Sequence, residues 1–456
     1  MNGTFYAARA DVRRWIKLAA GLPKLGLIRQ APSMDADAVR DYQTRRFREL
    51  YARARAEVPY YRDRPRDYPE MPAGIPAEEF LRRLPILDKS TVRAETDAFY
   101  STRKSLTRSY HCTSGTTGSA VKLAADAFER GFHNQILRSL YRGIAGGGRL
   151  RTMNLTGFVN PSETDDIYWT SPLTGTTYVS IFALKEANRD ILANLIRKHR
   201  PNLLYGYASA VFALARLLGD EFAQSRDERV AVVTSEVLLP GWRETMEASL
   251  FRRVFNQYSS LEGAHLAFEC ECGAMHVHPL VGIVELLGSR GEPVAAGEVG
   301  EVVSTGLIRE QMPLIRYALG DAAASTGGLP AHCPCGLSWT TIGEVAGRSD
   351  DLIQMRDGRR LGYVMRIVRT VSKEIPGIEE SQLVQTGYES FRFHLVLRPE
   401  ALSRRRDIER RLKDELEKIL RIGVRLEYRY MDAIPRVGRN KYKFIVVEKS
   451  EAASWN

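Results

Sequence analysis

The sequence YHCTSGTTGSAVKL, residues 110–123, contains an unusually dense run of small hydroxylated residues, because every position from 113 to 119 is Thr, Ser or Gly. Consecutive backbone N–H groups in a Gly-containing turn can cradle an anion, and the hydroxyls add uncharged donors. The run therefore suits the phosphates of a nucleotide, although a loop of this kind taken alone is more often an ordinary turn. It is not the strand–GxxxxGK[ST]–helix loop, because no Lys directly follows Gly118.

Length and composition indicate an ordinary globular protein. The chain has 456 residues, enough for two or three domains, with 44% hydrophobic and 27% charged residues. No apolar run approaches the roughly 18 residues of a membrane span, and we see no apolar signal core near the N-terminus. We therefore expect a cytoplasmic protein, whose oligomeric state the sequence leaves open.

The chain is basic, with 66 Lys and Arg against 55 Asp and Glu, a net charge of +11. It contains no nucleic-acid motif, so we expect phosphorylated small molecules rather than nucleic acid as partners. Residues 10–30 could also form a basic amphipathic helix that touches a membrane or an acidic carrier.

The order of the expected elements predicts an α/β fold in two parts. Residues 1–100 are expected to be mainly helical, and residues 105–345 alternate strands with helices, which favours a largely parallel, helix-covered sheet. Residues 282–307 look like an antiparallel meander. We expect a large domain over residues 1–347 and a small α+β domain over residues 348–456.

Four further motifs follow the hydroxyl-rich loop in order: YSSLEG (258–263), PLIRYALGD (313–321), GRSDDLIQMRDGRRL (347–361) and IPRVGRNKYKF (434–444). Together they resemble the acyl-adenylate-forming superfamily, and most of all its phenylacetate-CoA ligase branch with the capsule-locus relatives. The resemblance runs from about residue 60 to the C-terminus. It implies a large N-terminal domain, a small mobile C-terminal domain, and activation of a carboxylic acid with ATP and Mg²⁺.

The resemblance assigns the phosphate loop residue by residue. It implies that the β- and γ-phosphates of ATP contact Thr113, Ser114, Gly115, Thr116, Thr117 and Gly118. The family pattern continues with a small residue, Pro and Lys, whereas this chain has SAVK, with Lys122 one place later.

The second motif departs from the family's Tyr-Gly-x-Thr-Glu at two positions. The resemblance implies that Tyr258 stacks near the adenine and that Glu262 binds Mg²⁺, a hard cation that favours carboxylate oxygen. Ser259 replaces the family's Gly, and Leu261 replaces the Thr that contacts the α-phosphate, a role that Ser260 could take.

Two later motifs carry over ribose and hinge residues. Asp321 matches the Asp that accepts both ribose hydroxyls, and Arg348 matches an Arg that also contacts the ribose. Asp350 matches the hinge of the small domain. Ser235 and Glu236 occupy the position of an adenine-binding turn.

The catalytic lysine and the acyl pocket follow by the same resemblance. Lys441 lies six residues after Pro435, at the spacing of the family's catalytic lysine, and its ammonium could neutralise negative charge as it develops. Lys441, Glu262 and Thr113 form the expected catalytic set. The stretch containing Tyr205, Gly206 and Tyr207 resembles an acyl-pocket motif, with plain core as the equal alternative.

Two Cys-x-Cys-Gly pairs indicate a structural metal site. Cys270 with Cys272 and Cys333 with Cys335 suit a closed tetrahedral Zn²⁺ site. His276 is the alternative ligand, and free buried thiols are the alternative to any metal. Cys-x-Cys pairs also recur in this branch, by the same resemblance.

The expected reaction forms an acyl-AMP from a carboxylic acid, aromatic by resemblance, and transfers the acyl group to a thiol. CoA is the default acceptor, and a carrier protein, an amine or a hydroxyl is the alternative. Two other classes stay open. One is a catalytically inactive nucleotide-binding relative, and the other is a zinc hydrolase using HVHP (276–279), which lacks a His-Glu-x-x-His helix.

Overall fold

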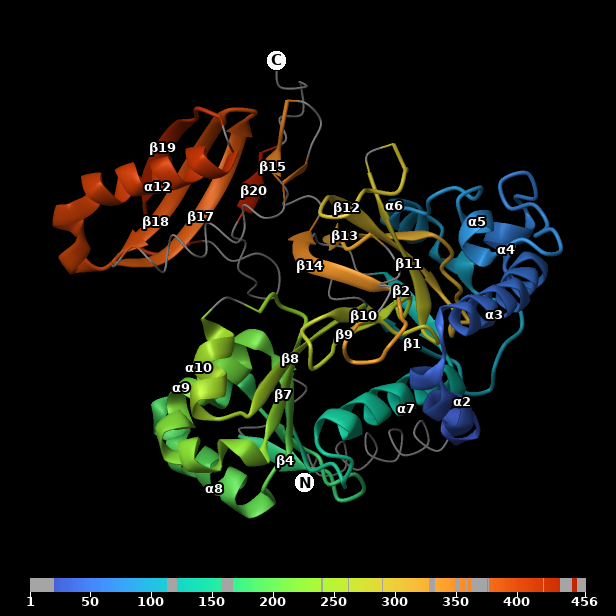
Figure 1. The fold of residues 1–456 in the computed structure, drawn as a ribbon, viewed down its shortest axis with the longest axis horizontal. Helices are drawn as coiled ribbons and strands as arrows, with labels where there is room; N and C mark the ends of the chain where they lie inside the picture. Colours follow the sequence, from blue (N-terminus) through green and yellow to red (C-terminus); the bar gives the residue numbers. More distant parts are fainter. Residues whose placement is uncertain are drawn as a thin grey trace.

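The computed structural model describes residues 20–112, 121–156, 167–238, 241–260, 262–288, 290–327, 333–348, 353–356, 360–361, 375, 377–420, 422–434 and 445–448. Figure 1 shows a large sheet with helices against it and a smaller sheet with its own helix near the C-terminus. Among the described helices, none is both long and apolar enough to cross a membrane.

The first described part of the chain is helical, as the sequence predicts. Its helices are α2 (Leu25–Gln30), α3 (Ala36–Glu57), α4 (Pro59–Arg62), α5 (Ala77–Leu81) and α6 (Lys89–Ala94), with 3₁₀ turns η1 (Leu22–Lys24), η2 (Ala31–Ser33) and η3 (Thr96–Phe99). The carboxylates of Asp35 and Asp88 each accept a backbone N–H three residues on, which caps α3 and α6. These two caps explain why the helices begin where they do.

One 12-stranded sheet forms the centre of the molecule, in the order β11-β12-β13-β14-β10-β9-β8-β7-β6-β3-β5-β4. Its strands are β3 (Thr152–Leu155), β4 (Tyr168–Thr170), β5 (Thr177–Val179), β6 (Leu203–Tyr207), β7 (Val230–Thr234), β8 (Arg253–Ser259), β9 (Leu266–Glu269), β10 (Met275–Val277), β11 (Gly282–Leu287), β12 (Val299–Gly306), β13 (Tyr317–Ser325) and β14 (Thr341–Arg348).

The expectation of a largely parallel sheet is wrong for this sheet as a whole. In this sheet only the neighbours among β5, β3, β6, β7 and β8 pair parallel. All the pairs on the other side of β8, which are made by β9, β10, β14, β13, β12 and β11, are antiparallel, and so is the pair of β4 with β5. The physical reason is connection length, since β8 reaches β9 through the six residues 260–265, too few for the crossover that parallel strands require. The expected meander is confirmed as the antiparallel set β11, β12 and β13.

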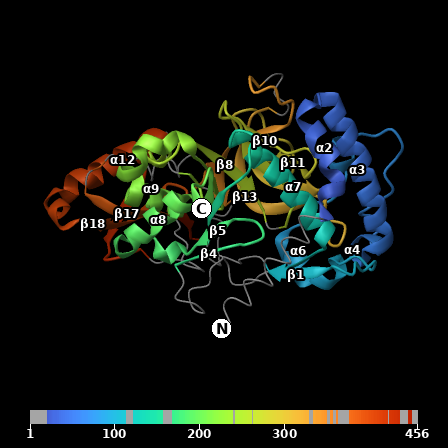
Figure 2. The same ribbon diagram turned by 90° about the horizontal axis from the view of Figure 1, so that it is seen from below.

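Helices cover both faces of the parallel part. They are α7 (Ala127–Ile144), α8 (Arg189–His199), α9 (Ala208–Phe222) and α10 (Trp242–Ser249), with η4 (Ile181–Ala183), η5 (Glu186–Asn188) and η6 (Ala223–Glu228) between them. On β6, Leu203 packs in the cluster that contains Tyr141 of α7, whereas Leu204 packs with α8, α9 and α10. Because neighbouring residues of a strand face opposite sides, α7 covers one face and the other three helices cover the second (Figure 2).

The helical lead-in packs on the antiparallel part of the sheet. The hydroxyl of Tyr61, which is fully buried, donates to the carbonyl of Pro313 at 2.9 Å and accepts the N–H of Ile315 at 3.2 Å. The indole N–H of Trp339 donates to the carbonyl of Ala31 at 3.1 Å. These bonds join the N-terminal helices to the segments that lead into β13 and β14.

A second, four-stranded sheet forms near the C-terminus, in the order β19-β18-β17-β20. Its elements are β17 (Ile378–Gly387), β18 (Ser390–Leu397), η8 (Pro399–Arg404), α12 (Arg405–Leu420), β19 (Arg425–Tyr430) and β20 (Ile445–Val447), preceded by the hairpin β15 (Ile353–Gln354) and β16 (Arg360–Leu361). Apolar residues of α12 and of the sheet share one core. The overall α/β class is confirmed, whereas the boundary at 347/348 and the mobility of the small part stay predictions.

Candidate functional site

The candidate site begins at the carboxyl end of β8. The hydroxyl of Tyr258 donates a hydrogen bond to Asp321 Oδ2 at 2.9 Å. Asp321 lies on β13, opposite Arg348, which is the last residue of β14. The structure describes the strand position of Arg348 only. Three motif residues that are far apart in the sequence therefore lie side by side.

Glu262 lies in the turn that joins β8 to β9. The N–H of Gly263 donates to the carbonyl of Ser260 at 3.0 Å, and Gly263 adopts a φ of +69°, in the left-handed region. A Cβ at this position would stand 2.4 Å from Arg309 Nε, so only glycine lets the Arg309 side chain pack against the turn. Arg309 therefore lies next to Glu262, whose carboxylate contributes to its electrostatic surroundings.

Glu129, near the start of α7, fixes the backbone that follows Arg309. Its Oε1 accepts the N–H of Glu310 at 2.6 Å and of Gln311 at 2.7 Å, while its other oxygen completes a capping box with Asp126. Burial raises the pKa of Glu129 to about 7, although the nearby Arg309 guanidinium acts to lower it.

Glu129 and Arg309 belong to none of the motifs that we interpreted. The sequence DAFE (126–129) does carry a capping-box pattern, which is a local signal. Its tertiary role, the contact with residues 310 and 311, joins segments that are far apart in the chain, and no local pattern indicates such a contact.

The proposed acyl-pocket stretch lies at the end of β6. Burial is the main cause that raises the pKa of Tyr205, and its hydroxyl interacts with Thr234 and Gln257. The side-chain oxygen of Gln257 also accepts a hydrogen bond from the hydroxyl of Tyr141 at 2.7 Å. A Cβ on Gly206 would stand 2.6 Å from a side-chain atom of the neighbouring β3. Packing alone therefore accounts for Gly206, while Tyr205 belongs to a buried polar network.

Ser235 and Glu236 follow β7 directly. Ser235 has a φ of +64°, which a non-glycine residue rarely adopts, and its side chain is exposed. Glu236 Oε2 accepts the N–H of Ser209 at 2.9 Å, at the start of α9. Glu236 thus ties the end of β7 to the segment that follows Tyr207.

The expected phosphate loop falls in the sequence between β1 (Ser109–Cys112) and β2 (Lys122–Ala125), two strands that pair antiparallel. Its residues Thr113, Ser114, Gly115, Thr116, Thr117 and Gly118 lie outside the described residues, as do Leu261, Asp350 and Lys441. Lys122 is exposed, and its ammonium stands 4.6 Å from the ring centroid of Tyr110. On β1, His111 Nδ1 lies 2.7 Å from Arg130 Nη2.

A second cluster gathers at β10 and the start of the segment that leads into β14. The potential ligand atoms of Cys270, His276, Cys333 and Cys335 all lie within 4.8 Å of one another. Cys270 Sγ and Cys333 Sγ are 3.8 Å apart, and Cys335 Sγ is 3.4 Å from His276 Nε2. A tetrahedron with metal–sulfur bonds of about 2.3 Å has sulfur–sulfur edges of about 3.8 Å, so these spacings fit zinc.

The turns around this cluster repeat one geometry. Gly273 and Gly336 have φ values of +83° and +84°, and each donates its N–H to the carbonyl of the first Cys of its pair at 2.9 Å. On the side of the ring away from the cluster, His276 Nδ1 lies 3.4 Å from the carbonyl oxygen of Trp339. Because a carbonyl can only accept, this contact favours the tautomer with the proton on Nδ1, and Nε2 is then free to bind a metal.

The observed cluster differs from the expected four-cysteine set at one position. Cys272 is exposed and lies outside the group of four, whereas His276 points into it from β10. Desolvation is the main cause that raises the pKa of the Cys272 thiol, and the neighbouring thiols of Cys270 and Cys333 raise it further. The four side chains that lie close enough together to hold one ion are therefore those of Cys270, Cys333, Cys335 and His276, the alternative that the sequence offers.

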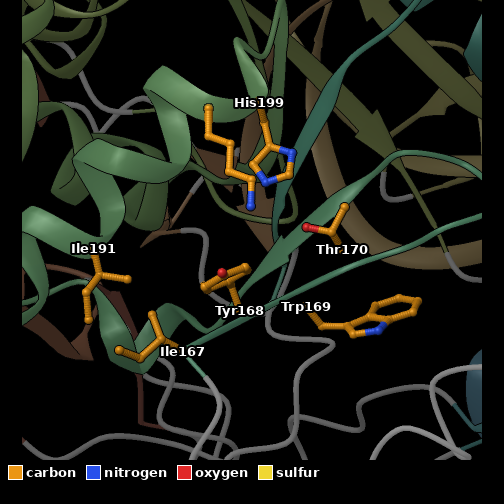
Figure 3. A pocket seen from close by; sticks show the side chains of 7 residues that line it. Ile167, Tyr168, Trp169, Thr170, Ile191 and His199 are labelled. Atoms are coloured by element: carbon orange, nitrogen blue, oxygen red, sulfur yellow. The ribbon is translucent and has the colours of Figure 1, made fainter.

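A surface pocket lies elsewhere, at the β4 edge of the sheet (Figure 3). Its volume is about 540 Å³, and it is lined by Ile167, Tyr168, Trp169, Thr170, Ile191, Lys198 and His199. The indole of Trp169 turns away from it and stacks on Tyr178. β4 is separated from β8 by four strands, so this pocket is distinct from the site at Tyr258 and Glu262.

Comparison with known proteins gives relatives of one kind. No family profile matches the chain. Protein CapK of Staphylococcus aureus is 23% identical over 385 residues, which cover 80% of each chain. A phenylacetate-coenzyme A ligase of Thermus thermophilus is 28% identical over 342 residues, covering 71% of this chain and 73% of the relative.

Solved structures share the fold. A 2-hydroxyisobutyryl-CoA ligase in the postadenylation state superposes with a TM-score of 0.65 at 16% identity, covering 92% of both chains. The same ligase in the thioesterification state gives a TM-score of 0.53 at 17% identity, covering 92% of this chain and 91% of the ligase. At this level of identity the match establishes the fold alone.

Proposed function

We propose that the chain is a phenylacetate-CoA ligase-like member of the acyl-adenylate-forming superfamily. It activates a carboxylic acid with ATP and transfers the acyl group to CoA. A carboxylate is a poor electrophile, so joining it to AMP creates a mixed anhydride with a good leaving group. The aromatic nature of the acid and the choice of CoA over a carrier protein, an amine or a hydroxyl belong to this proposal.

The observation that supports it best is the contact between Tyr258 and Asp321 beside the last residue of β14. Two oxygens of one carboxylate can accept two neighbouring hydroxyls, as a ribose requires. Glu262 lies only four residues beyond Tyr258, in the next turn, where its carboxylate would bind Mg²⁺. The adenosine and the metal would thus be held from one edge of the sheet.

The remaining roles follow from the family pattern. Thr113 to Gly118 would contact the β- and γ-phosphates, and Lys441 would offset negative charge as pyrophosphate leaves. A rotation of residues 348–456 about Asp350 would then withdraw Lys441 and admit the thiol. Ser235 with Glu236 would line the adenine, and Ser260 would approach the α-phosphate.

The test is exchange of labelled pyrophosphate into ATP in the presence of a panel of aryl and alkyl acids. We expect exchange that depends on the acid and falls by about 10²-fold or more in Lys441→Ala, the scale of losing one charge-stabilising group. Lys443→Ala is the matched control, because it removes a similar charge two residues away.

Mass spectrometry of the product with CoA, amines or alcohols then identifies the acceptor. Exchange that no acid stimulates would count against the proposal. If AMP or ATP nevertheless co-purified with the chain, the result would favour an inactive nucleotide-binding relative.

We also propose that Cys270, His276, Cys333 and Cys335 bind a structural zinc ion. Three thiolates and an imidazole leave no open position on a tetrahedral ion, so the metal would stabilise the fold rather than take part in the reaction. Metal analysis of the reduced protein is expected to give about one zinc per chain. A content under about half of that would contradict the assignment.

A further inference from the structure

Unsatisfied polar atoms gather at the β8–β9 turn. Among the described residues, Ser260 Oγ, both ring nitrogens of His265 and Arg309 Nη1 are buried and have no hydrogen-bond partner. A buried polar atom without a partner costs about 1–3 kcal/mol. Four such atoms in one place are a reason to look for a ligand, because native structures leave few of them.

The three residues belong to one small region beside the proposed nucleotide site. Ser260 begins the turn and His265 ends it, while Arg309 packs against Gly263 between them. The ring of His265 stands 4.4 Å, centroid to centroid, from that of Tyr258. His265 is fully buried, whereas Arg309 keeps partial exposure, so the region extends from the interior towards the surface.

The chemistry of the region favours an oxygen atom. Arg309 can only donate hydrogen bonds, and Ser260 can donate and accept. Burial, with a smaller contribution from His133, lowers the pKa of His265 to about 3. Its ring is therefore neutral near pH 7 and offers one donor and one acceptor, a set that suits a hydroxyl, carbonyl or carboxylate oxygen.

The proposed nucleotide contacts leave the acid as the source of that oxygen. In the proposed function, the adenine, ribose, phosphates and Mg²⁺ would contact Tyr258, Asp321, the phosphate loop with Ser260, and Glu262. The acid's carboxylate must lie beside the α-phosphate, near the same turn, so a substituent elsewhere on the acid can extend towards His265.

We propose that His265 and Arg309 form a polar subsite for an oxygen-bearing substituent of the acid, so that the preferred substrates are hydroxylated or carboxylated acids rather than plain hydrocarbon acids. The inference rests on the proposed acid activation. It deepens that function by naming the substrate class.

The experiment measures acid-dependent pyrophosphate exchange with matched pairs of acids. Each pair is a hydrocarbon acid and the same acid with an added hydroxyl or second carboxyl group, for example phenylacetate and its ring-substituted forms. The natural chain should prefer the oxygenated member by about 10²-fold or more in kcat/KM, because hydrocarbon analogues leave buried polar groups unpaired.

Two variants at His265 separate the proposal from simple packing. His265→Leu should reduce the preference ratio about 10-fold or more, since it removes both ring nitrogens at similar volume. His265→Gln, which keeps a donor and an acceptor, should retain most of the ratio. His199→Leu at the distant surface pocket is the control and should leave the ratio unchanged.

The outcomes separate the two proposals. Exchange with no preference in the natural chain, or an equal loss on both acids in His265→Leu, would overturn the subsite and leave the acid activation standing. In that case the unpaired atoms are satisfied by water only. No exchange with any acid would overturn both.

Discussion

The Tyr61→Phe substitution tests how strongly the N-terminal helices are joined to the sheet. The change removes one oxygen from a fully buried ring and leaves the carbonyl of Pro313 and the N–H of Ile315 without their partner. At about 1–3 kcal/mol for each buried group left unpaired, we expect the free energy of unfolding to fall by about 3 kcal/mol. The ring itself stays, so no large cavity adds to this value.

The expected shift in melting temperature follows from chain size. An unfolding entropy of about 2.1 cal/mol/K per residue over roughly 350 residues gives about 0.7 kcal/mol/K, so 3 kcal/mol corresponds to about 4 °C. Urea unfolding followed by circular dichroism measures the free energy directly, with an unchanged slope expected.

Tyr168→Phe is the matched control, because its side chain is 37% exposed and water replaces the lost bond. We expect a change within about 0.5 kcal/mol there. If Tyr61→Phe fell within the same limit, the reasoning that this hydroxyl bridges two buried backbone groups would be refuted.

Three further predictions concern the sheet, the metal cluster and pH. Gly206→Ala should lower the melting temperature and the expression of folded protein, because its Cβ would stand 2.6 Å from a side-chain atom of β3; a variant that melts like the natural chain would show that the strands can separate. His276→Ala and Cys335→Ser should each lose most of the bound zinc, whereas Cys272→Ser should retain it, as metal analysis will show; equal loss in all three would restore Cys272 to the ligand set. In the folded chain the pKa of His265 is lowered to about 3, so as the pH falls the unfolded chain binds this proton first. The contribution of His265 to the free energy of unfolding is therefore lost as the pH falls from about 6.5 towards 3. Urea unfolding at several pH values should show a weaker loss of stability in acid for His265→Gln than for the natural chain.

Local signals predicted the elements better than their pairing. The helical character of residues 1–100 was predicted, and the Asp caps that begin α3 and α6 are local features that involve only four residues. The parallel character of the sheet was overestimated, since strand direction depends on connections such as the short turn at residues 260–265. In the sequence these residues overlap the end of the YSSLEG motif, and in the fold they connect the antiparallel strands β8 and β9.

The site was predictable where a motif supplied it and not where the tertiary fold did. Tyr258 and Asp321 were identified from separate motifs, and their hydrogen bond brings them together. Arg309 and His265 gave no signal, because what distinguishes them is burial and missing partners. The capping-box pattern at Glu129 is local and does not indicate its contact with residues 310 and 311. These are properties of packing between α7, the β8–β9 turn and the β12–β13 connection, segments that are far apart in sequence.

The two Cys-x-Cys-Gly turns have a consequence for the unfolded chain. Cys270 and Cys333 are 63 residues apart, and an ion bound to both turns would act as a cross-link that closes this loop before folding. By the loop-entropy relation used for disulfides, closing about 60 residues reduces the freedom of the unfolded chain by about 4 kcal/mol at 25 °C. The pairing of β10 with β14 closes a loop of similar length. The entropic cost of this pairing would therefore be lower in the protein with the ion bound than in the metal-free protein.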